Sequence, residues 1–118
     1  MQPLVSIVIP SYNHELFIKE TIQSIISQSY ECLELIVIDD GSTDRSVEII
    51  ESLRNCCEKR FKNFIFYSRS NKGVCATLNE AMEQCTGKYV SFIASDDVML
   101  PEKTFTQVNY LENNSEIA

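Results

Sequence analysis

The chain has 118 residues, of which 44% are hydrophobic, and a formal net charge of −7. This length suits one domain with a buried core, and the acidic excess argues against a nucleic-acid-binding face, which needs clustered Lys and Arg. The five cysteines show no CxxC spacing and His14 is the only histidine, so the sequence predicts neither a disulfide framework nor a zinc site. Scattered reduced thiols fit a cytoplasmic protein.

The first half of the chain alternates between strand-like and helix-like patterns. The β-branched run 4–9 predicts a buried strand. From Glu15 onward apolar residues recur at helical spacing, which predicts a helix. A second buried strand is expected over 33–38, and Ser42 or Thr43 would cap the helix that follows it.

The second half repeats this alternation. That helix is expected to run through Leu53, and a third strand follows at 64–67. The next helix would bury one apolar face, consisting of Val74, Leu78, Ala81, Met82 and Cys85. Gly87 would cap its end, 89–94 would form the fourth strand, and Pro101 would open a last helix. The sequence therefore predicts an α/β fold, a Rossmann-like and mostly parallel sheet flanked by helices.

Polar residues directly follow each expected strand, where parallel sheets bind their ligands. In chain order these segments are Pro10-Ser11-Tyr12-Asn13, Asp39-Asp40-Gly41-Ser42, Arg69-Ser70-Asn71 and Ser95-Asp96-Asp97. The two Asp pairs would repel one another unless a cation or hydrogen-bond donors compensate, and Mg²⁺ or Mn²⁺ commonly combines one or two carboxylates with phosphate oxygens. Arg69 and Lys72 add positive charge for a diphosphate. The segments together predict a metal–diphosphate site.

Each segment also has a purely structural interpretation. Asp-Gly-Ser after a strand is a common turn, Tyr12 could pack on its own loop, and Arg69 could be a surface charge. His14 is interpreted as an N-terminal helix residue rather than as a ligand. The functional interpretation depends on several polar segments meeting at the same edge of one sheet.

The same segments resemble those of family-2 glycosyltransferases, which have the GT-A fold. Residues 5–13 are similar to the family's opening strand and loop, 35–44 to its second-strand motif, and 95–97 to its metal-binding motif. The resemblance covers essentially the whole chain and implies the N-terminal, nucleotide-sugar-binding part of a GT-A domain. The sequence departs from the common pattern where Ala94 replaces an Asp and Leu78 replaces an Arg.

The resemblance implies a set of nucleoside contacts. Pro10, Ser11 and Tyr12 would lie along the nucleoside of a nucleotide-diphosphate sugar, with UDP-sugars expected. One of Asp39 and Asp40, with Asp40 favoured, would accept a hydrogen bond from uracil N3–H.

It also implies phosphate and metal contacts. Arg69 or Lys72 would lie near the nucleotide, Asp96 would meet the ribose, and Asp97 would bind Mn²⁺ or Mg²⁺. The metal would stabilise the diphosphate leaving group during a single inverting displacement, which needs a base to take the acceptor proton. That base is expected downstream of Ala118, so no catalytic residue is assigned in this chain.

The expected domain is therefore a donor domain spanning 1–118 that stops before the acceptor half. Its partners would be a nucleotide-sugar donor and a glycan or lipid-linked acceptor, with no nucleic acid. An exposed sheet edge predicts a homo-oligomer. The expected location is cytoplasmic, or the cytoplasmic face of a membrane for a full-length protein.

Two alternatives stay open at this point. A phosphoacceptor receiver-like signalling domain has a similar size, acidity and metal requirement. However, it places its acidic pair after the first strand, where this chain has Pro10-Ser11-Tyr12-Asn13. The second alternative, a non-catalytic nucleotide-binding module, makes the same binding predictions as the donor domain.

Overall fold

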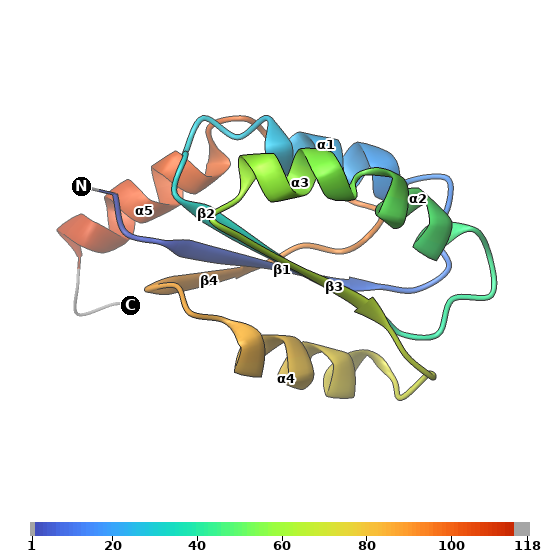
Figure 1. Ribbon diagram of the computed structural model, residues 1–118. Helices are drawn as coiled ribbons and strands as arrows, with labels where there is room; N and C mark the ends of the chain where they lie inside the picture. Colours follow the sequence, from blue (N-terminus) through green and yellow to red (C-terminus); the bar gives the residue numbers. More distant parts are fainter. Residues whose placement is uncertain (1, 115–118) are drawn as a thin grey trace.

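The computed structural model describes residues 2–114, in which four strands alternate with five helices (Figure 1). In chain order these are β1 (Val5–Ser11), α1 (Ile18–Ile26), β2 (Leu33–Asp39), α2 (Ser46–Ser52), α3 (Arg54–Arg60), β3 (Asn63–Ser68), α4 (Val74–Gln84), β4 (Tyr89–Phe92) and α5 (Lys103–Asn113). The expected domain range 1–118 also includes Met1 and 115–118, which lie outside the described residues.

The strands form one parallel sheet in the order β3-β2-β1-β4. Successive strands extend the sheet from β1 through β2 to β3, and β4 then returns to the other side of β1. The order therefore reverses between β1 and β4. This confirms the predicted Rossmann-like α/β fold and makes the carboxyl ends of β1 and β4 the place where such sheets bind ligands.

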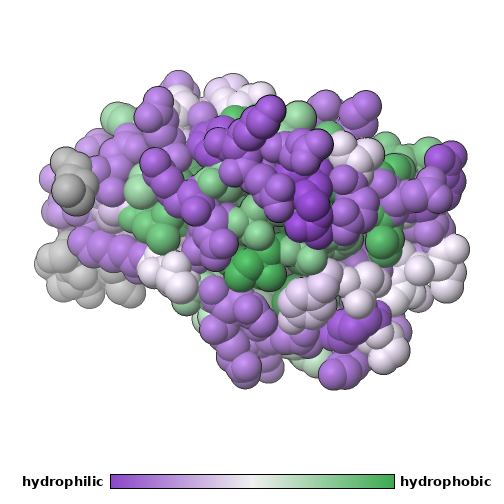
Figure 2. Space-filling model, viewed as in Figure 1, coloured by the Kyte–Doolittle hydropathy of each residue, from purple (hydrophilic) through white to green (hydrophobic). Residues whose placement is uncertain are grey.

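Helices cover both faces of the sheet, with α1, α2 and α3 on one face and α4 on the other (Figure 1). β1 and β2 are buried on both faces, which explains their continuous apolar runs. On the first face α1 contributes the fully buried Ile18, Ile22 and Ile25 to the larger core. On the second face Val8, Ile36 and Ile38 pack against Ala81 of α4. Hydrophobic surface shows in Figure 2 as a band between the upper helices and α4.

Two expectations about the second and third helices are wrong. The single helix expected through Leu53 is two helices, because the backbone of Leu53 (φ −99°, ψ 0°) ends α2 and begins α3. Neither Ser42 nor Thr43 caps α2; instead the Ser46 N–H donates to Asp44 Oδ1 at 2.9 Å. The first helix also begins later than expected, at Ile18, after a loop that contains residues 12–17.

Two expectations about α4 are also wrong. Val74 and Met82 are 58% and 49% exposed, because the helix turns only a narrow face that includes Thr77 and Ala81 to the sheet. Gly87 does not cap the helix, which ends at Gln84. A Cβ on Gly87 would lie 2.6 Å from Ser6 Oγ, so the glycine is required by the close approach of this segment to β1.

Two polar side chains, Glu34 and Arg60, hold connecting segments in place by hydrogen bonds. Glu34 of β2 is fully buried and accepts hydrogen bonds from the Ser6 hydroxyl and from the N–H and hydroxyl of Thr86. Arg60, at the end of α3, donates to four carbonyl oxygens of the α1–β2 connection, those of Ile26, Gln28, Tyr30 and Glu31. No helix among residues 2–114 has the length and apolarity to span a bilayer.

Candidate functional site

A pocket lies at the reversal point of the sheet, between the loops that follow β1 and β4. Its volume is about 440 Å³. It is lined by Pro10, Tyr12, Asn13, His14, Val74, Ala94 and Ser95. The lining therefore includes residues of two of the four segments that the sequence singled out, and Val74 lies three residues after a third, Arg69-Ser70-Asn71.

The loop after β1 carries an exposed ring and an unpartnered hydroxyl. Tyr12 is 46% exposed on the pocket wall, as a ligand-stacking side chain would be. The Ser11 hydroxyl is buried and has no hydrogen-bond partner among the described residues, which is an uncommon state for a buried polar group. Asn13 adopts φ 50° and accepts the Thr43 N–H, which ties this loop to the one after β2.

Asp39 stabilises the loop after β2. Its carboxylate is fully buried and accepts from the Ser42 N–H at 2.8 Å, the Ser42 hydroxyl at 2.6 Å and the Ser68 hydroxyl at 2.9 Å. All three donors belong to this loop or to the neighbouring strand β3. Asp39 therefore shapes the loop, and Asp40 is the better placed of the pair to meet a ligand.

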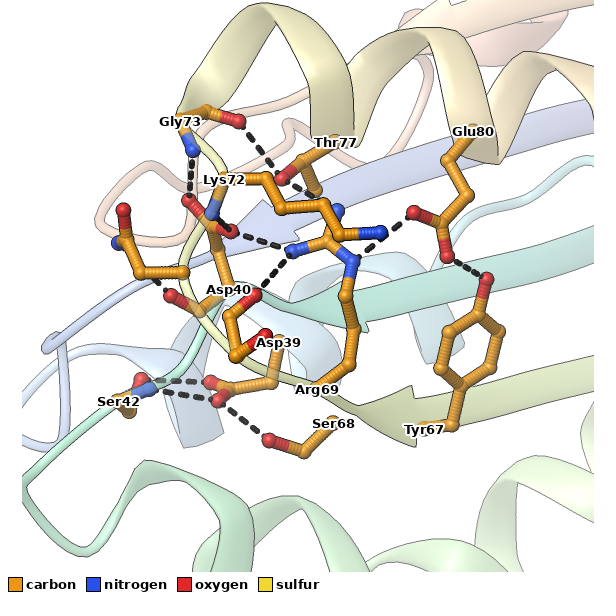
Figure 3. A network of polar contacts seen from close by, with 12 residues as sticks. Asp39, Asp40, Ser42, Tyr67, Ser68, Arg69, Lys72, Gly73, Thr77 and Glu80 are labelled. Atoms are coloured by element: carbon orange, nitrogen blue, oxygen red, sulfur yellow. Dashed lines mark hydrogen bonds and ion pairs between the residues drawn. The ribbon is translucent and has the colours of Figure 1, made fainter.

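Asp40 lies at the centre of a polar network that Figure 3 shows in close-up. Its Oδ1 accepts from Arg69 Nη1 and from the Lys72 N–H, and its Oδ2 accepts from the Gly73 N–H at 3.0 Å. Burial alone would raise the pKa of Asp40, but the hydrogen bonds from Lys72, Arg69 and Gly73 outweigh it and hold the pKa below the ordinary value. Asp40 is therefore an ionised carboxylate, which can only accept hydrogen bonds.

The loop after β2 also packs closely on the loop after β3. Gly41 adopts φ 76°, and a Cβ there would lie 2.7 Å from the backbone nitrogen of Asn71. The Asn71 side chain donates to the Asp40 carbonyl oxygen at 2.9 Å. This contact fixes the position of the Lys72 and Gly73 N–H groups that hold the Asp40 carboxylate.

The loop after β4 presents two exposed carboxylates, those of Asp96 and Asp97. The Thr21 hydroxyl of α1 anchors the loop from below, within 3.1 Å of the carbonyl oxygens of Ser95 and Asp97. His14 Nδ1 lies 2.5 Å from the Ser95 hydroxyl, and His14 Nε2 lies 3.7 Å from an Asp96 oxygen. His14 is thus a loop residue beside the carboxylates, and its interpretation as a helix residue is wrong.

This donor set fits a metal that is shared with a diphosphate. Within residues 2–114 no three His, Cys, Asp or Glu side chains are grouped as a metal cage. Mg²⁺ and Mn²⁺ need none, because they commonly combine one or two carboxylates with phosphate oxygens and water. The exposed Asp97 carboxylate, with Asp96 beside it, is the group in this loop that would hold such an ion.

The structure thus gathers most of the expected site residues at one end of the sheet, but it gives Arg69 a different environment. The Arg69 side chain is 14% exposed and hydrogen-bonded to Asp40, Glu80 and Thr77, whereas Lys72 is exposed. The sequence analysis missed the contributions of His14, Thr77 and Glu80. The position of His14, three residues beyond the end of a buried strand, was the available signal for the first of these.

Residues 6–118 match the family described as glycosyl transferase family 2. The chain belongs to this family. An uncharacterized glycosyltransferase of Haemophilus influenzae is 41% identical over 112 residues, which cover 95% of this chain and 44% of that relative. The family assignment leaves no support for a receiver-like domain.

Solved glycosyltransferases share the fold. The structure of S. aureus TarS 1–349 in complex with UDP-GlcNAc has a TM-score of 0.82 at 29% identity, covering 93% of this chain and 31% of that one. The mannosyltransferase PcManGT from Pyrobaculum calidifontis, in complex with GDP-Man and Mn²⁺, has a TM-score of 0.83 at 24% identity, covering 94% of this chain and 33% of that one. The chain therefore spans less than half the length of these proteins.

Proposed function

We propose that this chain is the donor domain of an inverting glycosyltransferase and binds a UDP-sugar together with Mn²⁺ or Mg²⁺. The observation that carries the proposal is the pocket at the reversal point, with the exposed Asp96 and Asp97 carboxylates at its rim and the ionised Asp40 nearby. Gly73 donates to Asp40 and is followed by Val74, which lines the pocket, so the carboxylate lies close to that space. The UDP-GlcNAc complex of TarS supports the same type of ligand.

Each residue has a proposed role in holding the donor. Tyr12 stacks on the nucleoside beside Pro10 and Ser11, whose unpartnered hydroxyl is a ready hydrogen-bonding group. Asp40 accepts an N–H of the base. A second group of residues lies nearer the phosphates: Lys72 approaches the diphosphate, Asp96 the ribose and Asp97 the metal. When bound, the metal neutralises the charge that develops on the departing diphosphate.

We assign acceptor binding and proton removal to other parts of a longer protein. The relatives are more than twice the length of this chain, and we place the acceptor site and the catalytic base in a segment after Ala118. The acceptor is proposed to be a glycan or a lipid-linked sugar. Turnover by a longer chain would separate this function from a non-catalytic nucleotide-binding module. The free cysteines favour a cytoplasmic location, or the cytoplasmic face of a membrane.

Calorimetric titration with UDP, with and without Mn²⁺, tests the donor site. Mn²⁺ is expected to tighten UDP binding at least about tenfold, because the acidic rim repels the diphosphate unless a cation bridges the two. Asp97→Ala should remove this metal-dependent gain, whereas Glu20→Ala, an exposed acid on α1, should leave it unchanged. UDP binding that ignores both Mn²⁺ and Asp97→Ala would contradict the proposal.

We also propose that the chain self-associates through the free side of β4. Among the described residues β4 pairs with β1 alone, and its Val90 and Phe92 are 38% and 47% exposed. A groove of about 610 Å³ runs beside it, with Val108 and Leu111 of α5 in its lining. A second copy can cover this edge by pairing strand to strand. Sedimentation at high protein concentration should detect a dimer that Val90→Lys weakens, and a clean monomer would refute the proposal.

A further inference from the structure

We propose that Arg69 is a positioning residue for base recognition: Glu80 and Thr77 hold its guanidinium, which fixes the Asp40 carboxylate so that one acceptor position stays open to a nucleobase N–H. This inference rests on the proposed nucleotide site and changes the role that the sequence suggested for Arg69. It also brings into the site Glu80, a residue of α4 that lies on the far side of Arg69 from Asp40 (Figure 3).

The hydrogen bonds of Arg69 leave it little capacity to bind a ligand. Its Nε–H donates to Glu80 Oε1 at 2.9 Å, and Nη2 donates to the Thr77 hydroxyl at 2.9 Å. Its Nη1 donates both to Asp40 Oδ1 and to the Ser70 carbonyl oxygen. A guanidinium has five N–H donors, so these four bonds leave one. Arg69 is therefore committed to the protein on both sides.

The Asp40 carboxylate has one hydrogen-bond acceptor position that these protein donors do not fill. An ionised carboxylate offers about four acceptor positions. Arg69 and the Lys72 N–H occupy two of these on Oδ1, and the Gly73 N–H occupies one on Oδ2. One position on Oδ2 is then left, on the oxygen that bonds to the residue preceding the pocket-lining Val74. Because a carboxylate held in this way cannot donate, it matches the N3–H of uracil and opposes the N3 lone pair of cytosine.

Glu80 holds Arg69 from the side opposite Asp40. Its Oε2 accepts the Tyr67 hydroxyl and its Oε1 accepts Arg69 Nε–H, so the carboxylate is itself held by two elements, β3 and α4. The Thr77 hydroxyl donates to the Gly73 carbonyl oxygen while it accepts from Arg69, which links Arg69 to the segment whose N–H groups bond Asp40. Without Glu80, only the Thr77 hydroxyl and the Ser70 carbonyl oxygen among the described residues would remain to orient the guanidinium beside Asp40.

Direct and indirect roles for Arg69 predict different ligand preferences. UDP and CDP carry the same ribose and diphosphate and differ at the face of the base. If Arg69 contacted the phosphates, its removal would weaken both ligands equally. If it positions Asp40, its removal weakens UDP and leaves CDP nearly unchanged. The ratio of the two dissociation constants therefore distinguishes the roles.

The experiment measures UDP and CDP binding by calorimetry in Mn²⁺ for the wild type, Arg69→Gln, Glu80→Gln and Arg45→Gln. We expect Arg69→Gln to lower the UDP-over-CDP preference about tenfold, as the loss of one charged hydrogen bond would, and Glu80→Gln to lower it about threefold. Arg45→Gln removes an Arg that pairs with Glu48 on the surface and should change neither ligand. Melting temperatures show which variants are folded. If Arg69→Gln is not folded, the binding data for Glu80→Gln test the positioning role.

The outcomes separate this inference from the proposed function. A wild-type chain that binds neither diphosphate in Mn²⁺ overturns the donor site itself. Equal affinity of the wild type for UDP and CDP, or an equal loss of both in the folded variants, overturns the positioning role and leaves the donor site standing. A preference for UDP that is unchanged in both folded variants overturns the proposal that Arg69 and Glu80 position Asp40.

Discussion

Replacing Glu34 with Leu is expected to lower the free energy of unfolding by about 1–3 kcal/mol, the cost of leaving a buried polar group without a partner. Leu occupies a similar volume, so the loss comes from the stranded donor rather than from a cavity. The buried donor is the Ser6 hydroxyl at 2.5 Å, whereas the N–H and hydroxyl of Thr86, at 2.7 and 2.8 Å, belong to an exposed residue and can bond to water instead. Urea unfolding at pH 7 measures the difference.

The contribution of Glu34 should also depend on pH. Burial by itself would raise the pKa of Glu34, but the hydrogen bonds from Ser6 and Thr86 outweigh burial and hold the pKa below the ordinary 4.5. A carboxyl with a lowered pKa stabilises the fold fully above its unfolded pKa, and this stabilisation is lost as the pH falls through the folded pKa. The gap between wild type and Glu34→Leu should therefore narrow as the pH falls from about 5 to 3.

Glu31→Leu is the matched control, because Glu31 is an exposed acid three residues before Glu34, in the connection that precedes β2. Its free energy of unfolding should stay within about 0.5 kcal/mol of wild type. A Glu34→Leu protein that loses no more stability than Glu31→Leu would show that the buried carboxylate does not stabilise the fold.

Replacing Arg60 with Met is expected to cost about 2–4 kcal/mol of unfolding free energy, the range for a few hydrogen bonds from a charged donor to partly buried acceptors. The guanidinium donates to Ile26 and Tyr30 at 2.8 Å and to Gln28 and Glu31 at 3.1 Å. It thus satisfies carbonyls between the last turn of α1 and the start of β2, which have no helical partners. Thermal unfolding and urea unfolding both report the loss.

Two further variants sharpen this prediction. Arg60→Lys keeps the charge but cannot present the planar fork, so it should recover less than half of the loss. Arg45→Met removes an exposed Arg whose partner is Glu48 and should have little effect. A folded Arg60→Met protein as stable as Arg45→Met would show that Arg60 does not stabilise the α1–β2 connection.

The sequence was informative wherever one local pattern decides the structure. The apolar runs at 4–9 and 33–38 correspond to β1 and β2, because strands that are buried on both faces have no polar alternation. The shared location of the polar segments could be predicted because a parallel topology brings the carboxyl ends of the strands to one edge of the sheet. The edge of the sheet that carries the candidate site could be predicted in this way without any knowledge of side-chain partners.

Partners that lie far apart in the sequence could not be predicted in the same way. The Arg69–Glu80 pair and the contact of His14 with Ser95 depend on how a helix and a loop settle against the sheet. Arg69 was therefore interpreted from its charge and from the family resemblance, either as a nucleotide contact or as a surface charge. The close approach of Gly87 to Ser6 was missed for the same reason, since a glycine near a helix end has the pattern of a cap.

The strand order has a consequence for how the protein is made. β1 is the first of the four strands to be synthesised, yet it pairs on both sides, with Leu33 opposite Val5 on one edge and the much later Tyr89 on the other. Contacts between nearby segments form before distant ones, so β1, β2 and β3 can assemble while one edge of β1 is still bare. The pocket at the reversal point is completed only when β4 and the loop after it arrive, so it is the last feature of this edge of the sheet to form on a growing chain.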